Sequence, residues 1–398
     1  MTISQVILKR QEPSMDMLFL LALFLAFFLT FFLAYFLASL EMRPFTFPRS
    51  LWKRPHEQLN VNVPLLKVPV ELIGCIATFL EPADKVLLSQ TCRSLRACLR
   101  KHSSAAHLSR ADYFVYLAGK ARELPEQWVC DYCMSLHRIN KRDKPTAEWP
   151  PSSCRADVAP APWRRTRLGD TCHIGIEHHH VQLALKYTRL QQPKYDSYLR
   201  ALLEPCRQKL FNTSGKRWVT HEVRYSAYPR IDTGSDGNPR FLLYSLWQYL
   251  AGGRDLILPN LGCQRICPHL EFRDDNYMAY NNCLLQCFLG VFEPSYADAE
   301  CRGSCSRCAT DFSVMRCGQS LYLQVWQDLG PEGSPLDLAW RCQNIRPGLD
   351  GIPNSATTGP TVYHKGGSIA ELYGPAPRRL PVPKRRTGWY CESNTPSP

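Results

Sequence analysis

Residues 17–40 constrain the chain more than any other feature, because this apolar stretch contains no charged side chain. As a helix it would be about 36 Å long, which exceeds the roughly 30 Å hydrocarbon core of a bilayer. The segment therefore predicts one transmembrane helix. Two alternatives stay open: a signal peptide cleaved near Ala34, Ala38 and Ser39, and a first exon that does not belong to the protein.

The charges that flank this segment predict its orientation. They are Lys9 and Arg10 on the N-terminal side, and Arg43, Arg49, Lys53 and Arg54 on the C-terminal side. Because Lys and Arg are enriched in cytoplasmic flanks, we expect a single-pass membrane protein whose main body is cytosolic. Cytosolic thiols stay reduced, so metal binding explains clusters among the 18 cysteines better than disulfides do.

Composition excludes wholesale disorder, since 45% of the residues are hydrophobic. The net charge of +13 is compatible with nucleic acid, anionic lipid or an acidic partner, and selects none of them.

We expect an α+β protein with these parts: a polar N-terminus (1–16), the transmembrane helix (17–40), a linker (43–63), a small all-α unit (64–110), a mixed α+β domain rich in Cys and His (111–344) and a disordered basic, Pro-rich tail (345–398).

Periodicity and turn residues place the elements of the mixed domain. Helices are predicted over 111–127 and over 181–204, the second broken near Pro193. Strands are predicted over 217–228 and 240–250, and a hairpin over 310–329 with Gly318-Gln319 as its turn.

The all-α unit 64–110 carries an apolar stripe. Pro69 suits a first helical turn, and Leu72, Ile76 and Leu80 recur every four residues after it. Asp84 and Thr91 are predicted caps of two further short helices. Helices this short bury little area, so the unit gains stability either by packing on the rest of the chain or by binding a partner.

The residue order in this unit is more specific than its periodicity. Leu66-x-Val68-Pro69-x-Glu71-Leu72, followed later by Thr91-Cys92-Arg93-x-Leu95-Arg96, resembles the F-box. The resemblance covers about 45 residues and departs from the common pattern at Val68 and Ser94. It implies docking onto the Skp-type adaptor of a cullin-RING ubiquitin ligase. The docking and core positions that it implies are Leu66, Pro69, Leu72, Ile76, Leu80, Leu88, Cys92 and Leu95.

A first Cys/His cluster begins with Cys130-x2-Cys133. This spacing brings two thiolates within reach of one tetrahedral zinc ion, so two more ligands must come from elsewhere. The alternative is a pair of buried thiols without metal. A nearby His137 is a possible ligand, although a loop histidine held by hydrogen bonds is the expected case.

The stretch from Trp128 to His137, followed by His180-Val181-Gln182-Leu183-Ala184-Leu185-Lys186-Tyr187, resembles a large group of fungal F-box proteins. The resemblance implies a fungal source. With it in view, we predict a structural zinc site and keep two reserve ligands. The predicted ligands are Cys130, Cys133, Cys172 and His180, and the reserves are Cys154 and His178.

A second cluster contains Cys263, Cys267-Pro268-His269, Cys283, Cys287, Cys301, Cys305-x2-Cys308 and Cys317. Cys305 and Cys308 are predicted ligands of a second metal site, with buried thiols as the alternative. Cys283 and Cys287 lie on one face of an apolar helix and are predicted core thiols. The C-P-H-L element, the C-x2-C-x-T-D-F element and Trp326-Gln327-Asp328-Leu329-Gly330 also resemble the fungal group.

Catalytic motifs are absent from the sequence, which has no H-E-x-x-H, Walker A, G-x-S-x-G or kinase loop. Asp232 and Asp236 lie among turn-forming residues and are predicted to be structural. We therefore expect a non-catalytic, membrane-anchored subunit that recruits an unknown protein substrate to a ubiquitin ligase. Nucleic acid is not an expected partner, because the basic residues are scattered. The alternatives are a zinc-stapled binding module without a ligase role, and a lumenal or secreted disulfide-containing protein.

Overall fold

The computed structural model describes residues 64–100, 104–131, 133–147, 174–213, 220–234, 236–251, 256–258, 261–262, 264–272, 283–293, 299–344, 360–377 and 385–390. The chain divides into two compact units, residues 1–67 and 68–398. The described part of the first unit is a 3-10 helix, η2 (Pro64–Lys67). The predicted transmembrane segment and linker lie outside the described residues. No helix within those residues has the length and apolar character needed to cross a bilayer.

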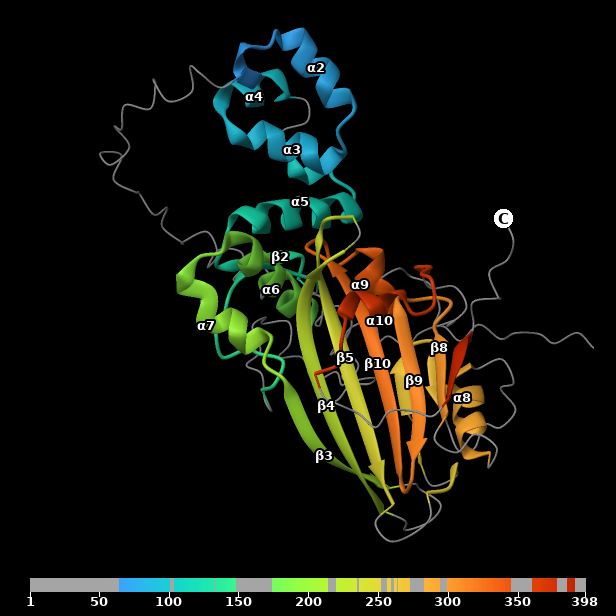
Figure 1. Ribbon diagram of the computed structural model, residues 1–398. Helices are drawn as coiled ribbons and strands as arrows, with labels where there is room; N and C mark the ends of the chain where they lie inside the picture. Colours follow the sequence, from blue (N-terminus) through green and yellow to red (C-terminus); the bar gives the residue numbers. More distant parts are fainter. Residues whose placement is uncertain are drawn as a thin grey trace, which may run out of the picture. The chain divides into compact units, whose positions relative to one another are not determined.

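The second unit is mixed α and β, which confirms the predicted α+β class. Its main sheet has seven strands in the order β11-β8-β9-β10-β5-β4-β3, and all neighbours are antiparallel except β11 and β8 (Figure 1). The strands are β3 (Cys206–Thr213), β4 (Thr220–Thr233), β5 (Pro239–Leu250), β8 (Ala299–Ser304), β9 (Thr310–Cys317), β10 (Ser320–Pro331) and β11 (Arg385–Tyr390).

Local sequence signals predicted much of this sheet. The strands predicted over 217–228 and 240–250 are β4 and β5. The predicted hairpin is formed by β9 and β10, which pair from Cys317 and Ser320 outward. Gly318 in its turn has a φ of 55°, which favours glycine. Asp236 lies in the β4–β5 turn and pairs with Arg240 at 3.0 Å, which confirms a structural role.

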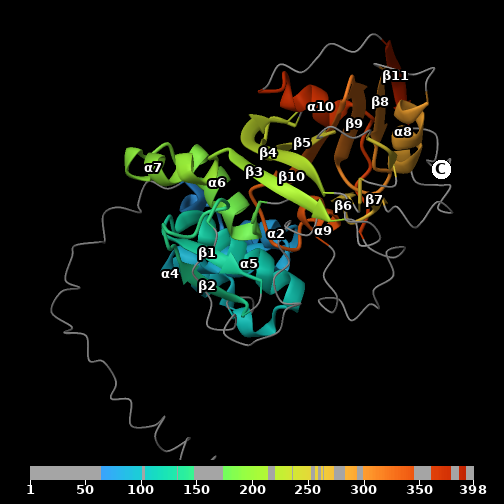
Figure 2. The ribbon, with the colours of Figure 1, turned by 90° about the horizontal axis from the view of Figure 1, so that it is seen from below.

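Both faces of the sheet are covered, and alternate residues of each strand point to opposite faces. Leu321, Leu323 and Val325 of β10 join the larger core, whereas Trp326 joins a smaller aromatic core. Helices α6 (His178–Leu190), α7 (Pro193–Leu202), α8 (Cys283–Phe292) and α9 (Leu338–Gln343) contribute to the larger core, as does the hairpin of β6 (Gln264–Cys267) and β7 (Leu270–Phe272). Figure 2 shows this hairpin and α9 on one face of the sheet and α10 (Ser368–Tyr373) on the other.

Helix α10 lies inside the stretch 345–398 that was expected to be a disordered tail, so residues 360–377 correct that expectation. Ile369 and Tyr373, four residues apart, are buried against β4, β9 and β10. The carboxylate of Asp311, at the start of β9, accepts hydrogen bonds from the backbone N–H groups of residues 367, 369 and 370. Two apolar anchors and one buried acceptor therefore hold a segment whose composition resembles a tail.

The unit expected to be all-α contains three short helices, α2 (Val70–Thr78), α3 (Pro82–Thr91) and α4 (Arg93–Cys98). Its helix caps differ from those predicted. Glu81 is the N-cap of α3 because Pro82 takes the first helical position. Cys92, and not Thr91, is the N-cap of α4, where its Sγ accepts from the backbone N–H of Leu95.

The next helix, α5 (Arg110–Glu123), packs against α3 and against the small hairpin of β1 (Gln127–Cys130) and β2 (Ser135–Arg138). Its C-terminal end is held by Lys186 of α6. The Nζ atom of Lys186 donates to the carbonyl oxygens of Ala121, Leu124 and Gln127 at 2.6, 3.3 and 2.7 Å. Burial lowers the pKa of Lys186 to about 8. One buried amine thus joins the end of α5 and the start of β1 to α6.

Candidate functional site

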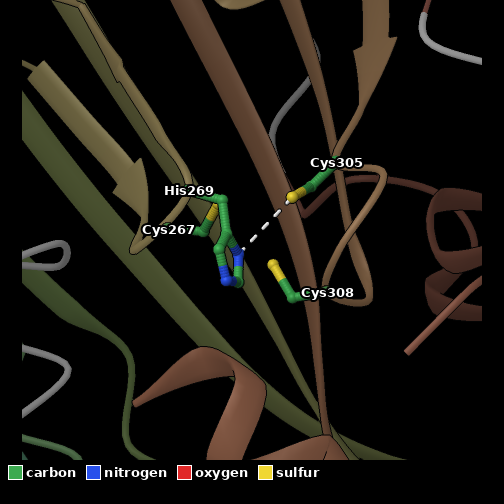
Figure 3. Close-up of side chains that lie close together, drawn as sticks. All are labelled: Cys267, His269, Cys305 and Cys308. Carbon is green, nitrogen blue, oxygen red and sulfur yellow. Dashed lines mark hydrogen bonds between the residues drawn. The ribbon is translucent and has the colours of Figure 1, made fainter. Parts of the chain in front are cut away.

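Four potential metal ligands meet where two separate segments of the chain approach each other. Cys267 ends β6, and His269 lies in the turn before β7. Cys305 and Cys308 lie in the loop that joins β8 to β9. Figure 3 shows the three sulfur atoms and the imidazole converging on one space.

The ligand atoms of these four residues lie within 4.8 Å of one another. His269 directs Nδ1 at the Sγ of Cys305, 3.6 Å away. The three cysteines are buried and His269 is half-buried. We call this group the Cys3His cluster.

The surroundings of the Cys3His cluster favour negative charge on one of its three sulfurs, that of Cys305. The backbone N–H of Arg307 donates to the Sγ of Cys305 at 3.4 Å, and the hydroxyl of Thr310 lies 3.2 Å from the Sγ of Cys308. Hydrogen bonds from Cys267 and Cys308 hold the pKa of Cys305 well below its usual range, whereas burial raises the pKa of the other two thiols. A thiolate and an imidazole in a dry pocket are the chemistry that binds a soft divalent cation.

The sequence predicted Cys305 and Cys308 as metal ligands, and the structure places both in this cluster. It did not pair them with Cys267 and His269, although these residues had been noted as Cys-Pro-His. His269 and Cys305 are 36 positions apart in the sequence, so their contact follows only from the fold.

A second group of potential ligands lies on the β1–β2 hairpin. Cys130, Cys133 and His137 bring their ligand atoms within 4.8 Å, and the Sγ of Cys133 is 2.9 Å from Nε2 of His137. His137 was expected to be a loop histidine held by hydrogen bonds. It lies in strand β2 rather than in a loop, and it hydrogen-bonds with Cys133 because β2 returns antiparallel to β1. The predicted ligand Cys172 and the reserve Cys154 lie outside the described residues.

The structure corrects the prediction that His180 completes this group. His180 lies with Asp143 and His179, and its Nδ1 accepts from the backbone N–H of Glu177 at 3.0 Å. The proton of the neutral ring must then be on Nε2, which donates to Asp143 at 3.1 Å. Neither ring nitrogen keeps a lone pair for a metal, so His180 is a capping residue of α6. The reserve ligand His178 contacts Gln182 on the same helix.

The Asp143 group is a buried ion pair. His179 directs Nε2 at Asp143, 3.0 Å away, and Nδ1 at Glu177, 3.5 Å away, so both nitrogens face carboxylates. Burial alone would lower the pKa of His179, but Asp143 and Glu177 raise it above the usual value. Hydrogen bonds from the two histidines likewise hold the pKa of Asp143 well below its usual range, against the effect of burial.

Helix α2 carries large apolar side chains that are exposed to solvent. Val70, Leu72 and Ile76 of α2 and Phe79 at its C-cap expose 52, 53, 44 and 88% of their surface, while Ile73 and Ala77 of the same helix are buried. Large exposed apolar side chains gathered on one short helix are unusual for a monomer. We call these four residues the α2 face.

The predicted docking and core positions divide by exposure. Pro69, Leu72 and Ile76 are exposed, Leu80, Leu88 and Cys92 are half-buried, and Leu95 is the buried residue of α4. Leu66 lies in η2. The predicted core thiols Cys283 and Cys287 are buried in α8, as expected.

Comparison of the chain with family models, curated proteins and solved structures finds no match.

Proposed function

We propose that this protein is a non-catalytic, membrane-anchored subunit that recruits a protein substrate to a cullin-RING ubiquitin ligase. In this proposal the α2 face docks onto a Skp-type adaptor, and the sheet domain holds the target. The observation that carries the proposal is the exposure of Leu72 and Ile76, which the F-box resemblance assigns to adaptor contact.

The burial pattern of α2 supports docking of a partner rather than packing within this chain. Ile73 and Ala77 already provide the contact with the other short helices, and α2 packs on α4. The apolar side chains that remain would each gain about 1.5–3 kcal/mol if a partner removed them from water. A small helical unit gains stability from such an interface, because it buries little area alone.

The remainder of the second unit suits a scaffold that carries a target. The seven-stranded sheet is covered on both faces, and α5 is joined to it through Lys186 of α6. Ubiquitin transfer would be performed by other subunits of the ligase. The segment 17–40 would restrict targets to those near a membrane, with the main body in the cytosol.

The proposed cofactor is zinc in a structural role. Thiolate and imidazole ligands suit zinc and do not suit calcium or magnesium, which prefer oxygen. The Cys3His cluster and the group of Cys130, Cys133 and His137 supply such ligands. Metal analysis of the purified protein tests this part of the proposal.

Adaptor binding is tested with the full-length chain in detergent and a purified Skp-type adaptor. Leu72→Asp combined with Ile76→Asp should abolish capture, because two charges would enter an apolar interface. The matched control is Leu338→Asp on α9, since Leu338 is 55% exposed but lies outside the α2 face. Equal capture by wild type and the double variant, or capture by neither, would remove the ligase proposal. Self-association through the α2 face in place of capture would also refute it.

A further inference from the structure

In the part of the chain that the structure describes, the β6–β7 hairpin makes no strand pairing with the main sheet, yet it lies close to the β8–β9 loop. The two strands form a sheet of their own. A hydrogen bond at 3.3 Å from the amide of Gln327 to the carbonyl of Ile266 links the hairpin to β10. Three buried cysteines and one histidine fill the space between the hairpin and the loop.

The spacing in this space matches tetrahedral coordination. A Zn–S bond of about 2.3 Å and a Zn–N bond of about 2.0–2.1 Å at the tetrahedral angle separate sulfur from nitrogen by about 3.5–3.6 Å. The distance from Nδ1 of His269 to the Sγ of Cys305 is 3.6 Å. All four ligand atoms lie within 4.8 Å of one another, so a small shift brings each to bonding distance of one ion.

We infer that Cys267, His269, Cys305 and Cys308 form a closed structural zinc site that fastens the β6–β7 hairpin to the β8–β9 loop. All three cysteines bind as thiolates, so any proton still on sulfur passes to water when the ion binds, and His269 binds through Nδ1 as the neutral ring. The complex of one Zn²⁺ with three thiolates carries one negative charge. The backbone N–H of Arg307 donates to the Sγ of Cys305 and stabilises that charge.

The full set of four protein ligands defines the role of the ion. A catalytic zinc keeps a position open for water or substrate, whereas four protein ligands close the coordination sphere. The inference specifies one site within the zinc cofactor proposed above, and it does not depend on adaptor binding.

The site also has a structural consequence beyond the hairpin. The carbonyl of Arg307, between the two loop cysteines, accepts a hydrogen bond from the backbone N–H of Val362 at 2.9 Å. Asp311, three residues after Cys308, accepts hydrogen bonds from the segment 364–370. Zinc therefore fixes the loop on which the segment 360–377 docks.

The test compares the metal content of full-length variants with that of wild type. Cys308→Ser and His269→Ala should each lose about one zinc per chain, whereas His269→Cys should retain it, since four thiolates also bind zinc. Cys287→Ser replaces a buried thiol outside the cluster and should keep the wild-type content. Cys133→Ser separates the ions, because zinc lost only in that variant would come from the β1–β2 hairpin and would refute the inference.

Two further measurements keep the result clear if a variant folds poorly. Wild type loaded with Co²⁺ should show intense thiolate-to-cobalt absorption, and this absorption should fall in Cys308→Ser. Chelation of wild type should increase amide exchange in residues 364–370. Unchanged zinc in Cys308→Ser, iron in place of zinc, or unchanged exchange after chelation would overturn the inference. Adaptor capture by Cys308→Ser is a separate readout, so loss of zinc with intact capture leaves the two proposals distinguishable.

Discussion

Replacement of Asp311 by alanine should detach α10 from the sheet. The Asp311 carboxylate is fully buried and accepts from the backbone N–H groups of Gly367, Ile369 and Ala370 at 3.1, 2.8 and 3.0 Å. Nε2 of His364 lies 3.0 Å from the same carboxylate. Four donors therefore depend on one acceptor group.

The expected cost follows from these four contacts. A hydrogen bond to a charged group contributes about 1.5–3 kcal/mol, and a buried donor left without a partner costs about 1–3 kcal/mol. The full sum is not reached, because the segment can detach and let its N–H groups bind water. We expect a loss of about 3–5 kcal/mol in the local opening free energy of residues 364–370.

Amide hydrogen exchange, read at residues 364–370, checks this value. Asp311→Ala should raise exchange there by about 100-fold or more, while exchange in β5 changes little. The control is Asp236→Ala, whose partly exposed carboxylate pairs with Arg240 and should matter by less than about 1 kcal/mol. Wild-type protection of α10 in the Asp311 variant would refute the view that this carboxylate holds the segment.

Three further substitutions or conditions test other contacts. Lys186→Met should destabilise the protein by about 1.5–3 kcal/mol in chemical denaturation, since three carbonyls lose their donor; no change would contradict the role given to the amine. Gly303→Ala should cost about 1–3 kcal/mol by thermal unfolding, because its methyl group would overlap the ring of Phe312, and a neutral result would show that the ring can move. The raised pKa of His179 contributes stability that is complete below pH 6.5 and is lost as the pH rises through the folded value. The lowered pKa of Asp143 contributes stability that is complete above pH 3.8 and is lost as the pH falls. Their joint contribution to the free energy of unfolding should be largest between these values, and in His179→Gln it should fall to the part that the hydrogen bond from His180 to Asp143 supplies.

The parts of the fold that the sequence predicted are those set by neighbours along the chain. Alternation and a Gly318-Gln319 turn predicted the β9–β10 hairpin, and Pro193 predicted the break between α6 and α7. Exposure of Leu72 and Ile76 could not be predicted, because a stripe of this spacing packs internally as readily as it docks.

The site was only partly predictable, because its ligands come from distant segments. The C-x2-C spacing of Cys305 and Cys308 was visible, but the approach of His269 depends on how β6 and β7 pack. His180 was misassigned for the opposite reason. Its partner Glu177 is only three residues away, and a local hydrogen bond to the backbone takes the nitrogen that a metal would need.

The buried amine of Lys186 limits how this protein can be divided for study. A fragment that begins after Cys130 would lack the three carbonyl partners of the amine, and it would also lack the carbonyl of Pro125 that accepts from Tyr187 at 3.1 Å. A shortened chain for crystallisation should therefore start before α5, because a later start would leave a buried amine without its carbonyl partners.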